Sequence, residues 1–278
     1  MVVVVAALVI IKVTTSSTTT SPSSGFQATD ATTLAQLTKI PATVFDTVGI
    51  KSPVAPVTPP IAIKGQPALT GATSTGATLP EVFYLGAEYC PFCAAQRWPT
   101  IVALSRFGTW SGLGNMDSST LTGEGYPGTP SFTFVKASYT SKYLAFRGIE
   151  EFNNVFNSSL NFYSPLQKPT TSENALFKKY DTSKWIPGMN STSNGSIPFE
   201  SIGNKFLVSG ASFTPATLAG LTRSQIAAGL SDPTSPVTDA IITSVNYQTA
   251  ALCVLTNNQP GNVCNSAGVS TAKKAMGL

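Results

Sequence analysis

The chain contains no histidine among its 278 residues, and only 11% of its residues are charged. Without histidine, Ser-His and Cys-His catalysis, His-ligated zinc and haem held by a His ligand are all excluded. The most common general base near neutral pH is missing as well. The reactive chemistry that remains belongs mostly to four cysteines and a few carboxylates.

Charge of either sign is sparse, with 17 basic and 13 acidic residues and a net charge of +4. No block or stripe of Lys and Arg is present, so we expect no nucleic-acid partner. Ser and Thr together make up about a quarter of the residues, well above the average composition. Such a polar but nearly uncharged surface suits an extracellular protein, especially one in acid, because few carboxylates change charge as the pH falls.

The N-terminal residues 1–13 form an apolar run that is interrupted by Lys12. The run is shorter than the roughly 20 residues of a membrane helix, and it has the length of a signal-peptide core. A basic start and an A-x-A cleavage site are missing. We expect this segment to direct export or to anchor the protein in a membrane; the alternative is a buried N-terminal strand, which repeated valine also favours. Residues 14–28, rich in Ser and Thr, are expected to form a flexible stalk.

The rest of the chain divides into an N-terminal extension, residues 29–75, and a single α/β domain, residues 76–278. The extension has two short helical candidates, followed by a proline-rich stretch that is expected to lie extended on the domain. The domain opens with a strand at 81–89 and a helix that runs from Cys93 and stops at Gly108.

Further along the domain, residues 131–136 and 143–150 are expected to form a strand pair. Residues 166–195 are polar and broken by proline and glycine, which predicts an insertion made of a helix and a loop. Two strands around Gly203-Asn204 predict a tight hairpin. Helices are then expected at 216–230 and 238–255.

Cys90 and Cys93 form the motif CPFC, for which three roles are open. A zinc site would need a second close ligand pair, but the other two cysteines are separated by ten residues and no histidine is present, so we expect no metal. A purely structural bridge is physically feasible, although closing so short a loop stabilises a fold only slightly. The third role is redox exchange.

The redox role is favoured by the position of the motif between a strand and a helix. Cys90 would lie at the helix N-terminus, where the free N–H groups and the helix dipole stabilise a thiolate. The thiolate is the form that attacks a disulfide, and the more shielded Cys93 would resolve the mixed disulfide. Glu88 would raise the pKa of Cys90, and Arg97 is a candidate counter-charge.

A redox site of the thioredoxin type also has a proline with a cis peptide bond facing the cysteines. Pro130 and Pro198 are the two candidates, and only Pro198 leads into a tight hairpin followed by a helix. We therefore favour Pro198 as the element that aligns the substrate strand. Ile197, which precedes it, and Phe92, within the motif, are expected to contact substrate.

Cys253 and Cys264 flank a turn-rich segment after a helix, which predicts a structural disulfide. Such a bridge would contribute about 3 kcal/mol on the loop-entropy estimate and would imply an oxidising compartment. The alternative is a second redox pair that relays electrons to the CPFC cysteines. Asn-x-Ser/Thr sequons, which predict glycosylation of an exported protein, occur at Asn157, Asn190 and Asn194.

The strings GAEYCPFCAAQRW, ALSRFG, TPSFTFVKASYTSKY, IPFESIGNKF and ALCVLTNNQPGNVC resemble an archaeal family of thioredoxin-like proteins catalogued as domain of unknown function 929. The resemblance covers about residues 30 to 270. It implies a thioredoxin-like α/β fold, with a central mixed sheet flanked by helices, on an exported or membrane-anchored protein. The family label implies no particular substrate. The dipeptide Pro-Phe differs from the Gly-Pro of thioredoxins and the Pro-His of many periplasmic oxidants.

The sequence thus predicts an extracytoplasmic thiol–disulfide oxidoreductase, at the cell surface or secreted, that acts on protein thiols and disulfides without a cofactor. The alternative is a non-catalytic surface or self-assembling protein on the same scaffold, with both cysteine pairs locked as disulfides. Four acidic residues with no evident partner are expected to be solvated loop charges: Asp117, Glu124, Glu150 and Glu151.

Overall fold

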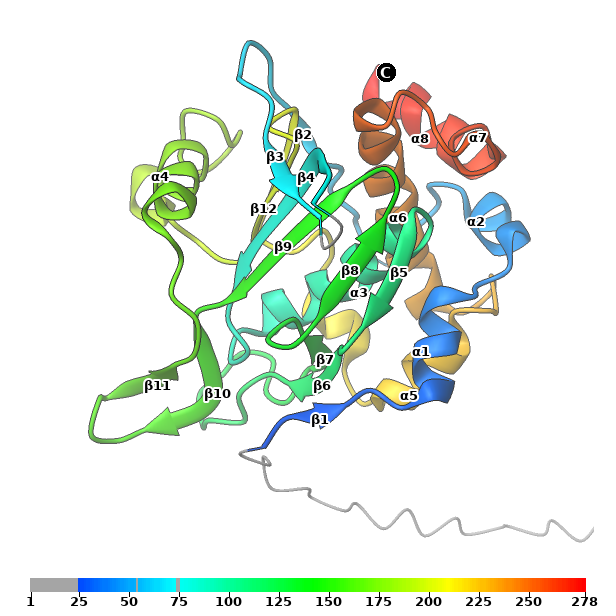
Figure 1. The fold of residues 1–278 in the computed structure, drawn as a ribbon. Helices are drawn as coiled ribbons and strands as arrows, with labels where there is room; N and C mark the ends of the chain where they lie inside the picture. The colour runs from blue at the N-terminus through cyan, green and yellow to red at the C-terminus, as the bar shows by residue number, and fades with distance from the viewer. Residues whose placement is uncertain (1–24, 54, 74–75) are drawn as a thin grey trace, which may run out of the picture.

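The computed structural model describes residues 25–53, 55–73 and 76–278, and in them helices cover both faces of a central mixed sheet (Figure 1). The apolar segment 1–13 and most of the expected stalk at 14–28 lie outside these residues. Within the described ranges, no helix combines the length and the apolar character that a membrane crossing requires.

The central sheet is built around β4, whose second half is buried on both faces. Its strands, in spatial order, are β2 (Ile61–Ala62), β13 (Phe206–Ser209), β12 (Phe199–Ile202), β4 (Thr78–Gly86) and β3 (Thr70–Ala72), and β9 (Ala145–Glu150) also pairs with β4. β9 is parallel to β4 and the other pairs are antiparallel. β3 pairs with residues 78–80 of β4, and β9 pairs with residues 81–86. The expected boundary between residues 75 and 76 therefore falls inside the β3–β4 hairpin.

The hairpin predicted around Gly203-Asn204 is confirmed as β12 and β13. Both turn residues have positive φ, 62° for Gly203 and 54° for Asn204, as a tight two-residue hairpin turn requires. A Cβ on Gly203 would also lie 2.6 Å from the side chain of Leu255. The hairpin positions the strand that lies next to β4.

The strand pair expected between 131–136 and 143–150 is wrong. β7 (Pro130–Thr133) pairs with β6 (Gly114–Asp117), and β1 (Gln27–Ala28) completes that small sheet. β9 joins the central sheet instead, where its apolar residues Ala145 and Ile149 are buried beside β4. Two further antiparallel pairs are β5 (Gly108–Ser111) with β8 (Ser138–Ser141), and β10 (Phe152–Asn157) with β11 (Phe162–Pro165). The β10–β11 hairpin extends away from the body, at the lower left of Figure 1.

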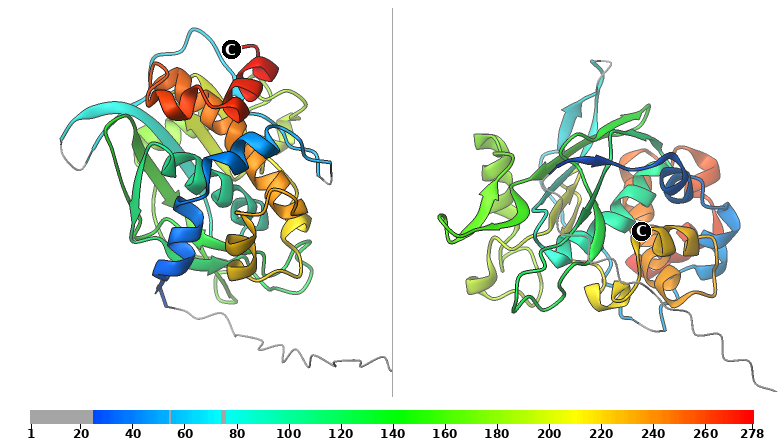
Figure 2. Two further views of the ribbon diagram at one scale, coloured as in Figure 1. Left: turned by 90° about the vertical axis from the view of Figure 1, so that its right-hand side faces the viewer. Right: turned by 90° about the horizontal axis from the view of Figure 1, so that it is seen from below.

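Two long helices, α3 (Pro91–Ser105) and α6 (Pro236–Leu255), cover one face of the central sheet. The expected helix within 166–195 is α4 (Thr171–Tyr180), followed by a loop with the 3₁₀ turn η1 (Ser191–Ser193). Phe177 and Tyr180 of α4 pack on the opposite face of the sheet, against Phe83, Leu85 and Phe199. Figure 2 shows these layers from two further directions.

The helix expected at 216–230 is interrupted. The 3₁₀ turn η2 (Pro215–Leu218) is followed by α5 (Arg223–Gly229). Gly220, with φ of 75°, breaks the first turn, and Thr222 begins a new helix through a capping box with Gln225.

The extension contributes α1 (Ala31–Thr38) and α2 (Ala42–Val48), which pack on α3, α5 and α6. Asn246 of α6 donates its amide to the carbonyls of Phe45 and Gly49, at 2.8 and 2.7 Å. The chain ends in α7 (Gly261–Cys264) and α8 (Ala267–Met276), near the top of Figure 1. Residues from the extension and from the C-terminus thus share one core.

Candidate functional site

The CPFC motif lies where the chain leaves β4 and enters α3. Cys90 is the N-cap of the helix, and Pro91 occupies its first turn, where its fixed φ and missing N–H are best tolerated. The N–H of Cys93 donates to the sulfur of Cys90 over 3.2 Å, so the first thiol takes the role that Ser or Asp has in other N-caps. Cys90 is 6% exposed and Cys93 fully buried.

The two thiols of the motif, both free, are electrostatically unequal. The pKa of Cys90 is lowered by the hydrogen bond from the Cys93 side chain, by the N–H groups of Cys93 and Phe92 and by the charge of Arg97, against the effect of burial. Burial raises the pKa of Cys93 well above its ordinary value, and the hydrogen bond and charge of Cys90 raise it further. The first sulfur therefore ionises readily, and the second holds its proton.

Ile197 and Pro198 reach the motif from the loop before β12. Their peptide bond is cis, and the Cys90 sulfur lies 3.8 Å from the Ile197 carbonyl oxygen, to which the thiol donates. Pro198 is buried and Ile197 half-buried. The other candidate, Pro130, opens β7, and its carbonyl accepts the indole N–H of Trp98 at 2.9 Å. The structure thus brings Pro198 to the cysteines.

Phe92 is the exposed member of the motif, with 42% of its surface accessible. Its ring meets that of Tyr126 edge to face, with centroids 5.8 Å apart. Tyr89, just before the motif, stacks on Tyr163 of the β10–β11 hairpin, with ring centroids 4.2 Å apart. The segment around Cys90 is therefore flanked by aromatic side chains from two separate parts of the chain.

Comparison with known protein families identifies the family of this chain. The family model described as Domain of unknown function (DUF929) matches residues 71–254, which is more than half of the chain. The chain belongs to this family. Neither the curated proteins nor the solved structures gave a match. The region shared with DUF929 includes the CPFC motif, Pro198 and Cys253, whereas Cys264 lies beyond its end.

The expectation that Glu150 is a solvated loop charge is wrong. In this DUF929 chain Glu150 is fully buried and forms a two-pronged ion pair with Arg97, at 2.8 and 2.6 Å. Arg97 also donates to the carbonyl of Ala87 at 2.7 Å. Burial acts to lower the pKa of Arg97, but the charge of Glu150 keeps it well above its ordinary value. A buried ion pair, whose guanidinium stays charged, therefore lies beside the motif.

Two other buried carboxyls lie near the motif in the fold. Burial raises the pKa of Glu88 to about 7, although the Thr133 hydroxyl donates to it at 2.6 Å. Glu200 of β12 has no exposed surface, and burial raises its pKa to about 7 as well. One Glu200 oxygen accepts hydrogen bonds from Gln96 and Thr100 of α3, and the other has no hydrogen-bond partner. Sequence reasoning missed Glu200, whose only signal was a charge inside an apolar strand.

Two of the three remaining acidic residues that were expected to be solvated have side-chain partners. Asp117 pairs with Arg223, and Glu124 accepts from the Tyr163 hydroxyl at 2.8 Å. Burial raises the pKa of Glu151. No group of three or more His, Cys, Asp or Glu residues in the described part of this DUF929 chain is arranged to hold a metal ion.

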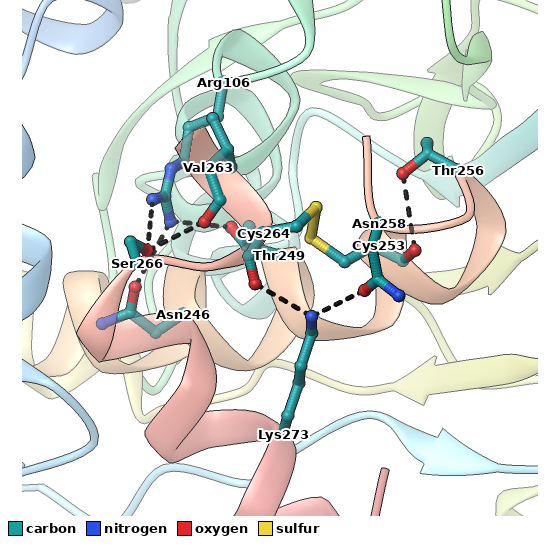
Figure 3. Close-up of a disulfide and its surroundings, with 10 residues drawn as sticks. All are labelled: Arg106, Asn246, Thr249, Cys253, Thr256, Asn258, Val263, Cys264, Ser266 and Lys273. Atoms are coloured by element: carbon teal, nitrogen blue, oxygen red, sulfur yellow. Dashed lines mark hydrogen bonds between the residues drawn. A yellow bond between two sulfur atoms is a disulfide. The ribbon is translucent and has the colours of Figure 1, made fainter. Parts of the chain in front are cut away.

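Cys253 and Cys264 form a disulfide that joins the end of α6 to α7, with Cα atoms 5.6 Å apart (Figure 3). Both cysteines are fully buried. Lys273 of α8 donates to the Cys264 carbonyl at 2.9 Å and to the Asn258 side chain at 2.7 Å. The helices that carry this bridge lie near the top of Figure 1, whereas the β10–β11 hairpin beside Cys90 lies at the lower left. This separation argues against a relay of electrons between the two pairs.

The three sequon asparagines differ in their surroundings. Asn190 and Asn194 are exposed in the loop after α4, where their side-chain oxygens accept backbone N–H groups. Asn157 is half-buried in β10 and donates to the Ser164 hydroxyl at 3.2 Å. If the chain is glycosylated, we expect occupancy in the loop before occupancy in the strand.

Proposed function

We propose that the protein is an extracytoplasmic thiol–disulfide oxidoreductase with a thioredoxin-like fold, acting on the cysteines of other proteins. The observation that carries the proposal is the inequality of the two thiols. Cys90 caps a helix, receives hydrogen bonds and has a lowered pKa, whereas Cys93 is buried beneath it with a raised pKa. This is the division of labour that an attacking and a resolving thiol need.

The exchange that this geometry supports has two steps. The Cys90 thiolate attacks one sulfur of a substrate disulfide, forming a mixed disulfide and releasing the other substrate sulfur as a thiolate, which takes up a proton. Cys93 then loses its proton and attacks the Cys90 sulfur, which forms the Cys90–Cys93 disulfide and releases the second substrate thiol. Two electrons pass from the cysteine pair to the substrate. The reverse sequence oxidises a substrate dithiol.

Two features support the thioredoxin-like assignment. The motif follows a central strand and opens a helix, and the cis bond before Pro198 brings the Ile197 carbonyl to the attacking sulfur. Pro198 then leads into the β12–β13 hairpin next to β4. In this arrangement Ile197 and Phe92 are the residues that would contact the substrate strand.

The location outside the cytoplasm is supported by the buried Cys253–Cys264 disulfide, because such bridges persist in oxidising compartments. The apolar segment at 1–13 would provide export or anchoring, and the exposed sequons would be open to glycosylation. The same features suit a non-catalytic or self-assembling surface protein, so the reactivity of the CPFC pair is what distinguishes the two functions.

The test is a trapping experiment. The Cys93→Ser variant should accumulate a mixed disulfide between Cys90 and a disulfide-containing protein, whereas the Cys90→Ser variant should trap none. The pair should also have a reduction potential above about −300 mV, since structural disulfides are more reducing than this value. A lower potential, together with no trapped adduct, would identify an inert scaffold.

A further inference from the structure

Large apolar side chains are exposed mainly in one region of the molecule. Among the described residues seven are exposed, namely Phe92, Leu121, Phe156, Leu160, Phe162, Leu166 and Leu278. Four belong to the β10–β11 hairpin and the residue that follows it, one to the CPFC motif and one to the loop after β6. Only Leu278, at the C-terminal end, lies apart from these segments. Such a concentration marks an interaction surface more often than chance exposure does.

The hairpin is attached directly to the residues that precede Cys90. The N–H of Glu88 donates to the carbonyl of Phe152 at 2.9 Å, and Tyr89 packs its ring against Phe162 at 5.5 Å. A two-stranded hairpin alone is marginally stable in water, and this aromatic packing holds its base against the motif. The apolar surface of the hairpin is therefore continuous with the proposed active site.

The loop after β6 closes the other side of this surface. The N–H of Ser119 donates to the carbonyl of Tyr89 at 2.9 Å, and the Ser119 hydroxyl accepts that of Tyr163 at 2.7 Å. The same loop carries Tyr126, whose ring meets Phe92. The hairpin, the motif and the loop are thus held together by hydrogen bonds and aromatic contacts.

A cavity of about 460 Å³ opens beside the hairpin. Its lining is mixed. Apolar side chains come from Phe26, Met116, Val135, Val155, Phe156 and Leu166, and polar ones from Glu88, Asn153, Asn154, Asn157, Ser158 and Ser164. Its volume is within the range of pockets that receive a ligand group or a large side chain. An extended chain lying along the hairpin therefore has a place for an apolar residue near its reactive cysteine.

Residues 152–166 contain no Asp, Glu, Lys or Arg. Glu88 in the cavity lining and Glu124, bonded to Tyr163, are acidic residues beside the hairpin. The hairpin itself, without charge, gives no preference to an acidic or a basic partner and does not repel an apolar one. It also favours contacts that are buried by the hydrophobic effect and are insensitive to salt. The chemistry of the surface therefore matches an uncharged, apolar stretch of polypeptide.

We propose that the β10–β11 hairpin is a docking arm that holds apolar segments of unfolded polypeptides against Cys90, so that the substrates are incompletely folded proteins rather than small-molecule thiols. The proposal rests on the proposed redox function for its catalytic consequence. Binding of the polypeptide itself needs only the arm and the cavity. Polypeptide binding and redox catalysis can therefore be tested separately.

The kinetic test uses the full chain and three probes: a disulfide-linked peptide with Phe and Leu beside its cysteines, the same peptide with Ser at those positions, and glutathione disulfide. The wild type should have a kcat/KM for the apolar peptide at least about tenfold above that for the Ser peptide, because several half-exposed side chains become buried. In the variant Phe156→Ser/Leu160→Ser/Leu166→Ser this ratio should fall to about one. Leu278→Ser, an exposed apolar residue at the C-terminal end, is the matched control and should keep the wild-type ratio.

A binding measurement separates failure of the arm from failure of the chemistry. A fluorescent, cysteine-free version of the apolar peptide should bind the wild type and bind the triple variant about tenfold more weakly in 0.1 M and in 1 M salt alike. Leu160→Ser alone, at a side chain that is 55% exposed, should weaken binding without lowering the unfolding temperature. The proposal would be overturned if the wild type bound the apolar peptide and its Ser counterpart equally well. It would also be overturned if the wild type and the triple variant bound the apolar peptide equally well. A triple variant that turns a dimer into a monomer while peptide binding persists would assign the arm to a second copy of the chain instead.

Discussion

Replacing Glu200 by glutamine separates the cost of ionising this buried carboxyl from the packing of its side chain. Glu200 has no exposed surface, and burial raises its pKa from 4.5 to about 7. The unfolded chain therefore releases the proton near pH 4.5, while the folded protein keeps it until about pH 7. Between these values the folded state binds more protons, so the free energy of unfolding falls as the pH rises.

The magnitude follows from the shift. One pKa unit corresponds to about 1.4 kcal/mol, so a rise from 4.5 to about 7 corresponds to about 3 kcal/mol of lost stability above pH 7. Glutamine keeps the oxygen that accepts from Gln96 and Thr100 and cannot ionise. At pH 4 the variant should match the wild type within about 1 kcal/mol, because the group left unpaired is neutral in both, a carboxyl O–H in one and an amide NH₂ in the other.

The assay is urea unfolding at pH 4, 5.5, 7 and 8, with the difference between Glu200→Gln and the wild type taken at each pH. This difference should grow from near zero to about 3 kcal/mol in favour of the variant. Other groups, Glu88 among them, affect both proteins equally and cancel. A difference that is constant with pH, or one that favours the wild type above pH 7, would refute the reasoning.

Three further outcomes follow from buried groups. Arg97→Met should destabilise the fold by about 3–5 kcal/mol in chemical unfolding, because it leaves the buried Glu150 carboxylate without its partner; a loss below 1 kcal/mol would mean that the pair is open to water. The double variant Cys253→Ser/Cys264→Ser should lose about 3 kcal/mol, since the bridge closes a short loop. In that variant the alkylation rate of the CPFC thiols should stay unchanged. A slower rate would support an electron relay between Cys253–Cys264 and the CPFC pair.

The sequence predicted that the CPFC motif lies between a strand and a helix. This was possible because the end of the apolar strand and Pro91, in the first turn of the helix, are local signals. The Gly203-Asn204 hairpin was predicted for the same reason, since both residues accept positive φ. The Cys253–Cys264 bridge needed only a turn-rich segment of suitable length.

The features that sequence reasoning missed depend on long-range contacts. In the sequence, Glu150 has the features of a solvated loop charge. Its partner Arg97 lies 53 residues earlier in the chain, so only the fold reveals the ion pair. The parallel pairing of β9 with β4 is decided by burial in the assembled sheet, and no local pattern encodes it. The β10–β11 hairpin was not predicted at all, because its asparagine-rich strands lack clear alternation and owe their position to aromatic contacts with Tyr89.

The most direct test of the account is the pH dependence of alkylation at each thiol of the reduced CPFC pair, with the modified residue located by mass spectrometry. Cys90 should react first, with an apparent pKa below the ordinary cysteine value of about 8.5, and Cys93 should stay protected until well above it. Faster alkylation of Cys93, or an apparent pKa of Cys90 at or above the ordinary value, would contradict the assignment of attacking and resolving thiols.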